Sequence, residues 1–274
     1  MSTIFDKFSL SGKTVVVTGG AGLLGRQFTT TLAQAGALVC VADIDFQAAQ
    51  AQVDRIIQEG SNAFAIMVDV TDPKSVHSMV DEVVRVSGRL DVLINNAALD
   101  PKFESQDFNR KADNAFETYP LNAWQDSLNV NLTGMFLVAQ AVATFMIKCG
   151  HGVIINICST YGLVGPDQRI YEIPGELRKF KPVDYSVTKA GVLGFTHYLA
   201  AYYAGTKIRV NALSPGGVYN EHGEGFVHNY SARTIMGRMA ELDEMNGAIL
   251  FLASEASSYM TGANLVVDGG WTAW

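Results

Sequence analysis

The sequence predicts an α/β fold in which one domain, residues 1–274, is built on a doubly wound parallel sheet with helices on both faces. Short apolar runs alternate with longer segments of helical periodicity, an order that specifies a parallel sheet covered on both sides. The runs are apolar along their whole length, as expected of strands buried on both faces. A chain of 274 residues, 48% hydrophobic and 17% charged, can bury a core of that size.

Seven apolar runs rich in β-branched residues are predicted as strands. In chain order they are Thr14–Thr18, Leu38–Ala42, Ala63–Val68, Leu90–Asn95, Val153–Ile157, Ile208–Leu213 and Asn264–Val267. The helical pattern between them is strongest over Gln47–Gln58, Ser75–Val86, Ala123–Met146, Ser186–Tyr203 and Glu241–Ala253. Asp45 is expected to cap the first of these helices. Ligands of such sheets bind beyond the carboxyl ends of the strands, so we expect the site there.

Three longer polar stretches interrupt this alternation, at about 99–120, 163–184 and 216–236. Each follows a predicted strand at the edge where a ligand should bind. Long irregular loops in a compact domain are usually functional or disordered. We expect these three to be substrate loops.

Composition excludes several classes of partner. The formal net charge is −7 and the isoelectric point is near 5.2, whereas nucleic acid or an anionic membrane would need a basic face. The first residues lack the apolar core of a signal peptide. The longest apolar stretch, about Met135–Ile147, is too short to span a bilayer. We therefore expect a soluble cytoplasmic protein that binds a small molecule, with no nucleic-acid or membrane partner.

The three cysteines do not have the spacing of metal ligands. Cys40, Cys149 and Cys158 lie in or beside apolar segments, so they are expected to be small buried hydrophobic residues in a reducing compartment. No metal site is expected.

A glycine cluster directly follows the first predicted strand. Gly19, Gly22 and Gly25 stand between that strand and a helix, in the segment TGGAGLLG. Glycine lets the backbone approach a pyrophosphate and adopt positive φ, while the first free N–H groups of the helix attract an anion. The cluster predicts a dinucleotide-binding loop, with Leu23 and Leu24 among the residues at the cofactor.

A carboxylate ends each of the next two predicted strands. Asp43, after the second strand, can accept the adenosine ribose hydroxyls and would repel a 2′-phosphate. The glycine loop holds no basic residue, although Arg26 follows it, so we expect NAD rather than NADP. The alternative for Asp43 is an ordinary strand-end or helix-capping carboxylate. Asp69, after the third strand, could accept a hydrogen bond from the adenine amine, and capping the next helix is nearly as good an interpretation.

Tyr185 and Lys189 occur as YSVTK within a predicted helix. Residues at this spacing lie on one helix face about one turn apart, so the ammonium can favour the ionised phenol. The phenol pKa would then fall from about 10 toward working pH, as an acid/base group requires. Such a pair alone is more often a surface tyrosine and lysine on an ordinary helix. Asn131 and Ser159 upstream favour the catalytic interpretation.

Several segments, in order, resemble those of the short-chain dehydrogenase/reductase family, and the match covers nearly the whole chain. They are TGGAGLLG, VDV at 68–70, NNAA at 95–98, NVNLTG at 129–134, INICSTYG at 155–162, YSVTK, VNALSPGGV at 210–218 and TGANLVVDGG near the C-terminus. The resemblance implies a Rossmann fold and hydride transfer between a nicotinamide cofactor and an alcohol or ketone carbon. It adds to the cofactor-binding residues Val70, Asn96, Ala97, Pro215, Gly216 and Val218.

The resemblance also implies a catalytic tetrad of Asn131, Ser159, Tyr185 and Lys189. Ser159 would polarise the substrate oxygen, and Tyr185 would give or take its proton. Lys189 would bind the ribose hydroxyls and lower the phenol pKa, and both Tyr185 and Lys189 would touch the cofactor. Asn131 would hold a water that links Lys189 to solvent.

The chain departs most from the family in the distance between two catalytic residues. Twenty-six residues separate Ser159 from Tyr185, about twice the usual number. The extra residues must leave and re-enter the active site, so they are expected to border the substrate mouth. Within them Arg169 would contact an anionic group and Tyr171 would stack on a sugar face. The alternative is an oligomer contact or a solvated surface loop.

The leading hypothesis is an NAD(H)-dependent oxidoreductase that acts on a polar, sugar-like secondary alcohol or ketone. The chain also resembles a subgroup linked to bacterial surface-sugar and flagellin glycosylation, and, more distantly, gluconate- and ketogluconate-type dehydrogenases. One alternative is a 3-oxoacyl-(acyl-carrier-protein) reductase, which would prefer a basic glycine loop and an apolar acyl channel. Another is a catalytically silent dinucleotide-binding regulatory protein, which would usually lack the Tyr or the Lys. The family commonly forms tetramers, so a homo-oligomer, tetramer or dimer, is expected, with Trp271 and Trp274 as candidate contacts.

Overall fold

The computed structural model describes residues 3–100, 114–175 and 177–274. At its centre lies a parallel sheet of seven strands in the order β3-β2-β1-β4-β5-β6-β7. The strands are β1 (Thr14–Thr18), β2 (Leu38–Asp43), β3 (Asn62–Met67), β4 (Val92–Asn95), β5 (Gly152–Ile157), β6 (Ile208–Pro215) and β7 (Asn264–Val267). The prediction of seven parallel strands is confirmed, and strand ends differ from the predicted ones by two residues at most.

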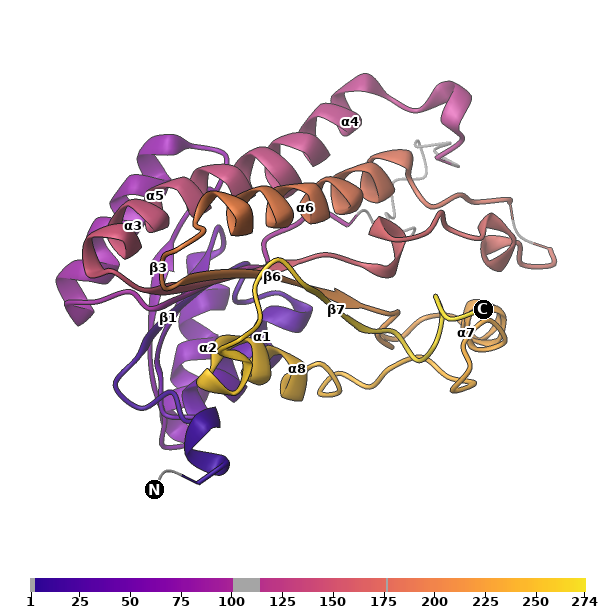
Figure 1. Ribbon diagram of the computed structural model, residues 1–274. Coiled ribbons are helices and arrows are strands. Elements are labelled where there is room, and N and C mark those ends of the chain that lie inside the picture. Colours follow the sequence, from indigo (N-terminus) through magenta and orange to yellow (C-terminus); the bar gives the residue numbers. More distant parts are fainter. Residues whose placement is uncertain (1–2, 101–113, 176) are drawn as a thin grey trace.

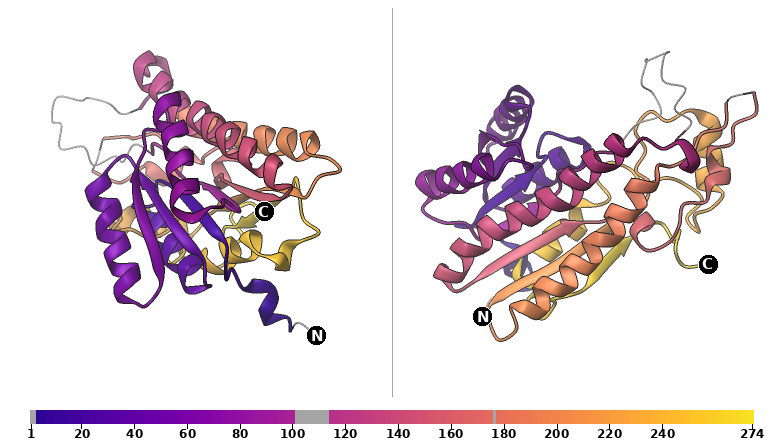
Figure 2. Two further views of the ribbon diagram at one scale, coloured as in Figure 1. Left: turned by 90° about the vertical axis from the view of Figure 1, so that its left-hand side faces the viewer. Right: turned by 90° about the horizontal axis from the view of Figure 1, so that it is seen from above.

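Helices lie on both faces of the sheet, as predicted. They are α1 (Leu23–Gln34), α2 (Phe46–Gln58), α3 (Pro73–Ser87), α4 (Leu121–Leu128), α5 (Met135–Cys149), α6 (Val183–Tyr202), α7 (Glu224–Ser231) and α8 (Asn246–Ala253). Helices α1, α2 and α8 cover one face, and α3, α5 and α6 cover the other (Figure 1). Seen from above, α5 and α6 run side by side across the sheet (Figure 2). Helix α7 lies beyond the carboxyl edge of the sheet, near the C-terminus (Figure 1).

Successive side chains of the central strands point to opposite faces of the sheet and pack into two separate hydrophobic cores. On β1, Val16 packs into the core under α3 and α5, whereas Val15 and Val17 pack into the core under α1, α2 and α8. Every residue of β1 and of β4 is buried. Burial on both faces therefore explains why these strands read as unbroken apolar runs rather than as alternating ones.

The strand order reverses between β1 and β4, and this reversal positions the candidate site. From β1 the chain moves outward through β2 to β3, then returns past β1 to β4 and continues to β7. In open parallel sheets, ligands bind in the crevice at this switch point, beyond the carboxyl ends of the strands. The glycine loop after β1 and the NNAA segment after β4 both lie there.

Three predicted segments differ in the structure. The predicted helix 123–146 is divided, because a π-helical turn, Asn129–Gly134, joins α4 to α5. The predicted loop 216–236 contains α7, a short helix that depends on packing rather than on its own Gly- and His-rich sequence. The predicted helix 241–253 begins only at Asn246. Of the predicted loop 99–120, residues 101–113 lie outside the described residues.

The structure also tests the prediction that the three cysteines are buried. Cys40 and Cys158 are buried, but Cys149 is exposed at the end of α5, so the prediction of burial is wrong for that cysteine.

The continuous helical stretch Leu121–Cys149 is long and apolar enough to cross a membrane by length and composition. Half of the apolar part of this stretch is buried inside the protein, and α5 packs on the sheet. Both features are typical of a core helix.

The amino edge of the sheet holds a buried carboxylate, Asp91, just before β4. Its side chain is 3% exposed and accepts hydrogen bonds from Arg89 at 2.7 and 2.6 Å, from the Thr14 N–H at 2.9 Å and from His151 Nε2 at 2.9 Å. Lys13 Nζ lies 3.6 Å away. Burial alone would raise the pKa of Asp91, but the hydrogen bonds from Arg89, Thr14 and His151 lower it to about 2. The cluster ties β1 to β4 and to the start of β5.

Candidate active site

The glycine loop is shaped by backbone contacts within the protein. Gly19 has φ of +61°, and a Cβ at this position would lie 2.8 Å from Ala97 Cα. A Cβ on Gly25 would overlap the carbonyl oxygen of Gly19. Only glycine fits such positions, so Gly19 holds the loop against the segment after β4, and Gly25 lets α1 start close beneath it.

The first turn of α1 is open to an anion. The helix begins at Leu23 after Gly22, and among the described residues no side chain caps its first N–H groups. Gly22 and Leu23 are exposed, and Leu24 is half-buried. Uncapped N–H groups at a helix start, behind a glycine loop without side chains, fit the diphosphate of a dinucleotide. The residues present therefore fit the predicted cofactor.

Asp43 lies at the end of β2, beside the glycine loop. Its Oδ2 accepts the Ala21 N–H at 3.0 Å and its Oδ1 accepts the Asp45 N–H at 3.1 Å. Asp45 itself caps α2, as predicted, by accepting the Ala48 N–H. Arg26 donates from Nε to the Ala21 carbonyl at 2.6 Å. A carboxylate and a guanidinium thus flank the same turn, and the carboxylate belongs to the strand end where a ribose is expected.

Asn96 and Thr18 tie the segment after β4 to the glycine loop. The Asn96 amide donates to the carbonyls of Thr18 at 3.1 Å and Gly19 at 2.9 Å. The Thr18 hydroxyl accepts the N–H groups of Asn96 at 3.1 Å and Ala97 at 3.2 Å. Sequence reasoning missed Thr18, although its place as the last residue of β1, facing the strand that enters NNAA, would have indicated it.

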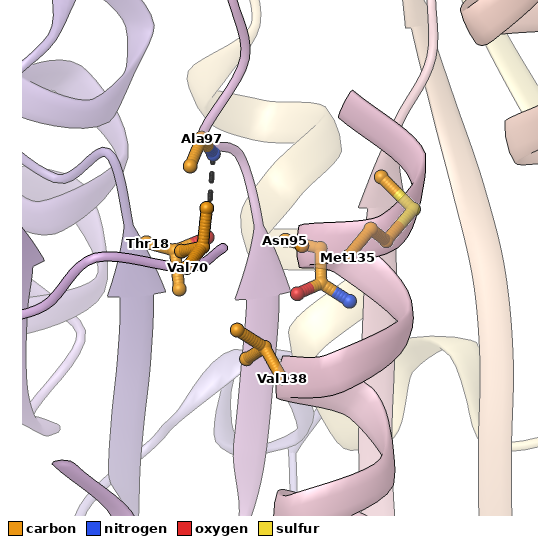
Figure 3. A pocket seen from close by; sticks show the side chains of 7 residues that line it. Thr18, Val70, Asn95, Ala97, Met135 and Val138 are labelled. Carbon is orange, nitrogen blue, oxygen red and sulfur yellow. Dashed lines mark hydrogen bonds between the residues drawn. The ribbon is translucent and has the colours of Figure 1, made fainter. Parts of the chain in front are cut away.

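A small hollow lies beneath these residues, where β1 and β4 meet α5 (Figure 3). It is lined by Thr18, Val70, Asn95, Ala97, Gly134, Met135 and Val138. The predicted cofactor residues Val70 and Ala97 therefore share one site. Asp69, predicted near the adenine, accepts hydrogen bonds from the Thr71 N–H and hydroxyl at 2.8 and 2.7 Å; helix α3 is capped by Asp72.

Three of the four predicted catalytic side chains converge. Ser159 lies two residues after the end of β5, and the interaction of its hydroxyl with that of Tyr185 lowers the pKa of Tyr185. The Lys189 ammonium lies 5.7 Å from the centre of the Tyr185 ring and donates to the Ile157 carbonyl at 3.0 Å. One turn of α6 therefore delivers the phenol and the ammonium to the carboxyl end of β5.

The ionisation of this group differs from the expectation. Burial raises the pKa of Tyr185, against the lowering effect of its hydrogen bond with Ser159, and burial lowers the pKa of Lys189. We predicted a lowered phenol pKa from helix spacing, and for the protein without ligands this prediction is wrong. Spacing shows which groups are neighbours, but it does not measure the desolvation that opposes their charges.

Asn131 stands inside the π-helical turn. Its side chain accepts the Leu99 N–H at 2.7 Å and donates to the Leu99 carbonyl at 3.1 Å and to the Thr188 hydroxyl at 3.2 Å. The buried amide thus joins the segment after β4 to α6, one residue before Lys189. π-Helical turns of this kind are frequent at functional sites. The predicted water at Asn131 stays a prediction.

The predicted nicotinamide segment is held by α7 and by the loop after it. The Gly217 N–H donates to the Tyr230 hydroxyl at 2.5 Å, and Gly216 donates to the Val267 carbonyl at 2.8 Å. Val218 forms an isolated parallel bridge with Ala240. Pro215 ends β6, so the segment from Pro215 to Val218 leaves the sheet at its carboxyl edge. Tyr230 is a positioning residue that sequence reasoning missed.

The stretch between Ser159 and Tyr185 packs against α7. Tyr171 is buried, with its hydroxyl 3.2 Å from that of Tyr161 and its ring centre 5.4 Å from that of Phe226. Arg169 is 76% exposed and pairs with Asp167 at 2.7 Å. The structure does not bring Arg169 and Tyr171 together, and their roles as substrate contacts stay predictions.

The C-terminal tryptophans have different surroundings. Trp271 is buried within the chain, with its ring centre 4.4 Å from that of Tyr230, rather than at a subunit surface. Trp274 is exposed and donates to the Arg233 carbonyl at 3.0 Å.

Three charged residues near Tyr185, in space or in sequence, were missed. The Lys181 ammonium lies 3.9 Å from the centre of the Tyr185 ring and 2.5 Å from Asp100 Oδ1. A third, Asp184, is fully buried at the start of α6, and neither of its oxygens has a hydrogen-bond partner among the described residues. Lys181 lies four residues before Tyr185, a spacing of about one helical turn, and this spacing could have indicated from the sequence that the two are neighbours. Asp100 could not, since it comes from a distant segment.

Comparison with known proteins agrees with this geometry. The sequence profile of a family described as Enoyl-(Acyl carrier protein) reductase matches residues 20–272. The D-threitol dehydrogenase of Mycolicibacterium smegmatis is 32% identical over 99% of this chain and 97% of its own length. The 3-oxoacyl-(acyl-carrier-protein) reductase of Thermotoga maritima is 34% identical over 95% and 98%. A crystal structure of a gluconate 5-dehydrogenase from Burkholderia cenocepacia, in complex with NADP and tartrate, has a TM-score of 0.85 and 32% identity over 99% and 100% of the two chains.

Proposed function

The chain belongs to the short-chain dehydrogenase/reductase family, and on that premise we propose an NAD-dependent dehydrogenase that acts on a polar, hydroxyl-rich secondary alcohol or the corresponding ketone. The observation that carries the proposal is the convergence of Ser159, Tyr185 and Lys189 at the carboxyl end of β5. A hydroxyl that binds a substrate oxygen, a phenol that exchanges its proton and a cation beside that phenol are what alcohol oxidation requires.

The residues of the chain handle the proton. Ser159 and Tyr185, whose hydroxyls interact with each other, bind the substrate oxygen between them. Tyr185 as phenolate takes the hydroxyl proton when an alcohol is oxidised, and as phenol returns it when a ketone is reduced. Lys189 stabilises the phenolate from the next turn of α6. Asn131 keeps the Leu99 segment and α6 in register around this group.

The glycine loop, α1 and Asp43 would hold the dinucleotide, whose nicotinamide accepts or supplies the hydride when bound. Asp43 at the strand end supports NAD over NADP, because a carboxylate there repels a 2′-phosphate. Arg26, on the same turn, is the feature that would favour NADP instead. Fluorescence titration with NADH and NADPH distinguishes NAD from NADP specificity. Tighter binding of NADH supports Asp43 as the determinant, and equal or tighter binding of NADPH contradicts it.

The substrate class rests on the relatives and on the loops. Curated relatives include dehydrogenases of threitol and gluconate, and the stretch between Ser159 and Tyr185 carries polar and charged side chains. We propose that the loops at 99–120, 163–184 and 216–236 form the substrate mouth of one domain, residues 1–274. The link to surface-sugar or flagellin glycosylation stays a hypothesis.

A second candidate is supported by a specific relative. The Thermotoga maritima protein, a 3-oxoacyl-(acyl-carrier-protein) reductase, is as similar to this chain as the polyol dehydrogenases. A turnover screen decides between the two: polyols, aldonates and keto-sugars with NAD⁺ or NADH, against a 3-oxoacyl thioester with NADH or NADPH. Turnover of the thioester alone would overturn the polar-substrate proposal. Turnover of neither class, with dinucleotide binding intact, would favour the catalytically silent regulator.

We further propose that the protein is a cytoplasmic homo-oligomer without a membrane or nucleic-acid partner. Three exposed aromatic side chains, Phe136 on α5 and Tyr198 and Tyr202 on α6, support an assembly through these helices. Light scattering after gel filtration tests this, and a monomeric mass at micromolar concentration would contradict it.

A further inference from the structure

Lys181 occupies an unusual position against Tyr185. Its ammonium lies 3.9 Å from the ring centre, nearer than that of Lys189 at 5.7 Å. The Lys181 side chain is only 11% exposed. Cations at such distances interact with the ring face, and the interaction strengthens when the cation is desolvated.

The position of Lys181 is built by the stretch between Ser159 and Tyr185. The Gln168 side chain accepts the Lys181 N–H at 2.8 Å and donates to the Lys181 carbonyl at 3.3 Å. The next residue, Pro182, is buried and precedes the first turn of α6. Lys181 is therefore anchored at its backbone on both sides before its side chain extends over the ring.

Asp100 is the partner of Lys181 and is the more exposed of the two. The ion pair is 2.5 Å long, and the Asp100 side chain is 53% exposed. Asp100 follows Leu99, which the Asn131 side chain holds from both sides. The pair thus links the segment after β4 to the stretch that precedes α6, directly above the acid/base residue.

Charged and titratable groups face Tyr185 from every side. Lys189 comes from its own helix, Cys158 and Tyr161 come from the residues after β5, Asp100 comes from the segment after β4, and Lys181 comes from the stretch before α6. Burial and the Asp100 charge raise the pKa of the Tyr185 phenol. Burial, and to a smaller extent the Lys181 charge, lower the pKa of Lys189. Burial and Asp100 therefore disfavour a phenolate at this site, and a second cation near the ring would oppose both effects.

We propose that Lys181 is a positioning residue for the acid/base step, a second cation that stabilises the Tyr185 phenolate through the face of its ring, with Asp100 tempering its charge. The negative charge of a phenolate spreads onto the ring, so a cation over the ring face interacts with it more strongly than with the neutral phenol. The inference rests on the proposed role of Tyr185.

The ion pair makes a two-sided test possible. In Lys181→Met, which keeps an apolar side chain of similar length, the kinetic pKa of kcat/KM for alcohol oxidation should rise by about one unit. Activity below that pKa should fall about tenfold and recover at high pH. In Asp100→Asn the kinetic pKa should move the other way, by about half a unit. Lys181→Arg should keep the wild-type profile, and Lys148→Gln, an exposed lysine at the end of α5, is the matched control.

A second readout does not depend on turnover. NMR titration of ring-labelled tyrosine in the NAD⁺ complex, with the Tyr185 signal assigned by Tyr185→Phe, should show the phenol of Lys181→Met titrating at higher pH. An unchanged phenol titration in that variant overturns the proposal, as does a changed KM with an unchanged kinetic pKa, which would make Lys181 a substrate ligand. Retained turnover in Tyr185→Phe would instead refute the proposed function, and the NMR titration would still decide the role of Lys181.

Discussion

At the amino edge of the sheet Asp91 is buried among groups that stabilise its charge, whereas at the carboxyl edge Lys189 is buried and Tyr185 half-buried among groups that stabilise their charges only in part. Asp91 has Arg89, His151 and a backbone N–H around one carboxylate, and its pKa falls to about 2. Burial shifts the pKa values of Tyr185 and Lys189 the other way, toward their neutral forms.

The contrast separates a stabilising charge from a reactive one. A fully satisfied buried carboxylate joins elements and is inert, while incompletely compensated groups gather where a ligand is to change their ionisation. Asp184, the residue before Tyr185, is also buried, and its oxygens have no hydrogen-bond partners among the described residues. We expect substitutions at the two edges to affect different properties, stability at one and turnover at the other.

The largest effect is expected at the carboxyl edge. Tyr185→Phe removes the proton-transfer group and should lower kcat by about a thousandfold, while the affinity for NADH changes little because the glycine loop is untouched. Steady-state kinetics and fluorescence titration measure the two quantities. A variant that keeps its turnover would show that the reactive edge has been misplaced.

Asp91→Asn tests the amino edge with an isosteric change. Loss of the charge breaks the bidentate pair with Arg89 and weakens the tie between β1 and β5, so the free energy of unfolding should fall by about 2–4 kcal/mol. Urea denaturation measures it, and kcat at low temperature should remain near wild type. A stability unchanged within error would mean that the cluster contributes no more than a surface ion pair.

Asp184→Asn makes the same substitution where the carboxylate has no partner. A carboxyl group buried without a hydrogen-bond partner is costly, and its replacement breaks no hydrogen bond, so the free energy of unfolding should rise by about 1 kcal/mol. The two aspartates are matched controls for each other, because one isosteric change is expected to give opposite signs. Destabilisation of both to the same extent would erase the proposed difference between the edges.

The last prediction concerns the pH dependence that Asp91 contributes. Its folded pKa is lowered from 3.8 to about 2, so its contribution is fully present above pH 3.8 and is lost as the pH falls toward 2. The shift corresponds to about 2 kcal/mol. Stability measured from pH 5 to pH 2 should fall more steeply in wild type than in Asp91→Asn, and parallel curves would contradict the assignment.

Most of the fold could be predicted because its signals are local. Each of these signals is recognised from residues close together in the chain: the unbroken apolar strands, the helical periodicity and the glycine turn. The seven strands lie where they were predicted. Helix α7 was not predicted, since it is short and is held by tertiary packing, in which Tyr230 accepts a hydrogen bond from the Gly217 N–H. The π-helical turn at Asn131 likewise leaves no periodic signature in an apolar helix.

The site was predicted where family motifs mark it; of the residues that were missed, Thr18 and Lys181 had a local signal, and only Asp100 depends on a distant segment. Gly19, Asp43, Ser159, Tyr185 and Lys189 lie at the predicted edge, while Thr18, Asp100 and Lys181 were overlooked. Tyr171, predicted to face the substrate, packs on Phe226, because an apolar ring is buried wherever the chain offers it neighbours.

By itself the sequence determined the class of fold, the dinucleotide loop and the Tyr185–Lys189 pair, because each depends on residues close together in the chain. Only the tertiary structure decided how those groups ionise and what stands over them. Desolvation depends on how the segments pack. The pair of Asp100 and Lys181 beside the Tyr185 ring joins segments about eighty residues apart, which only the folded sheet edge brings together.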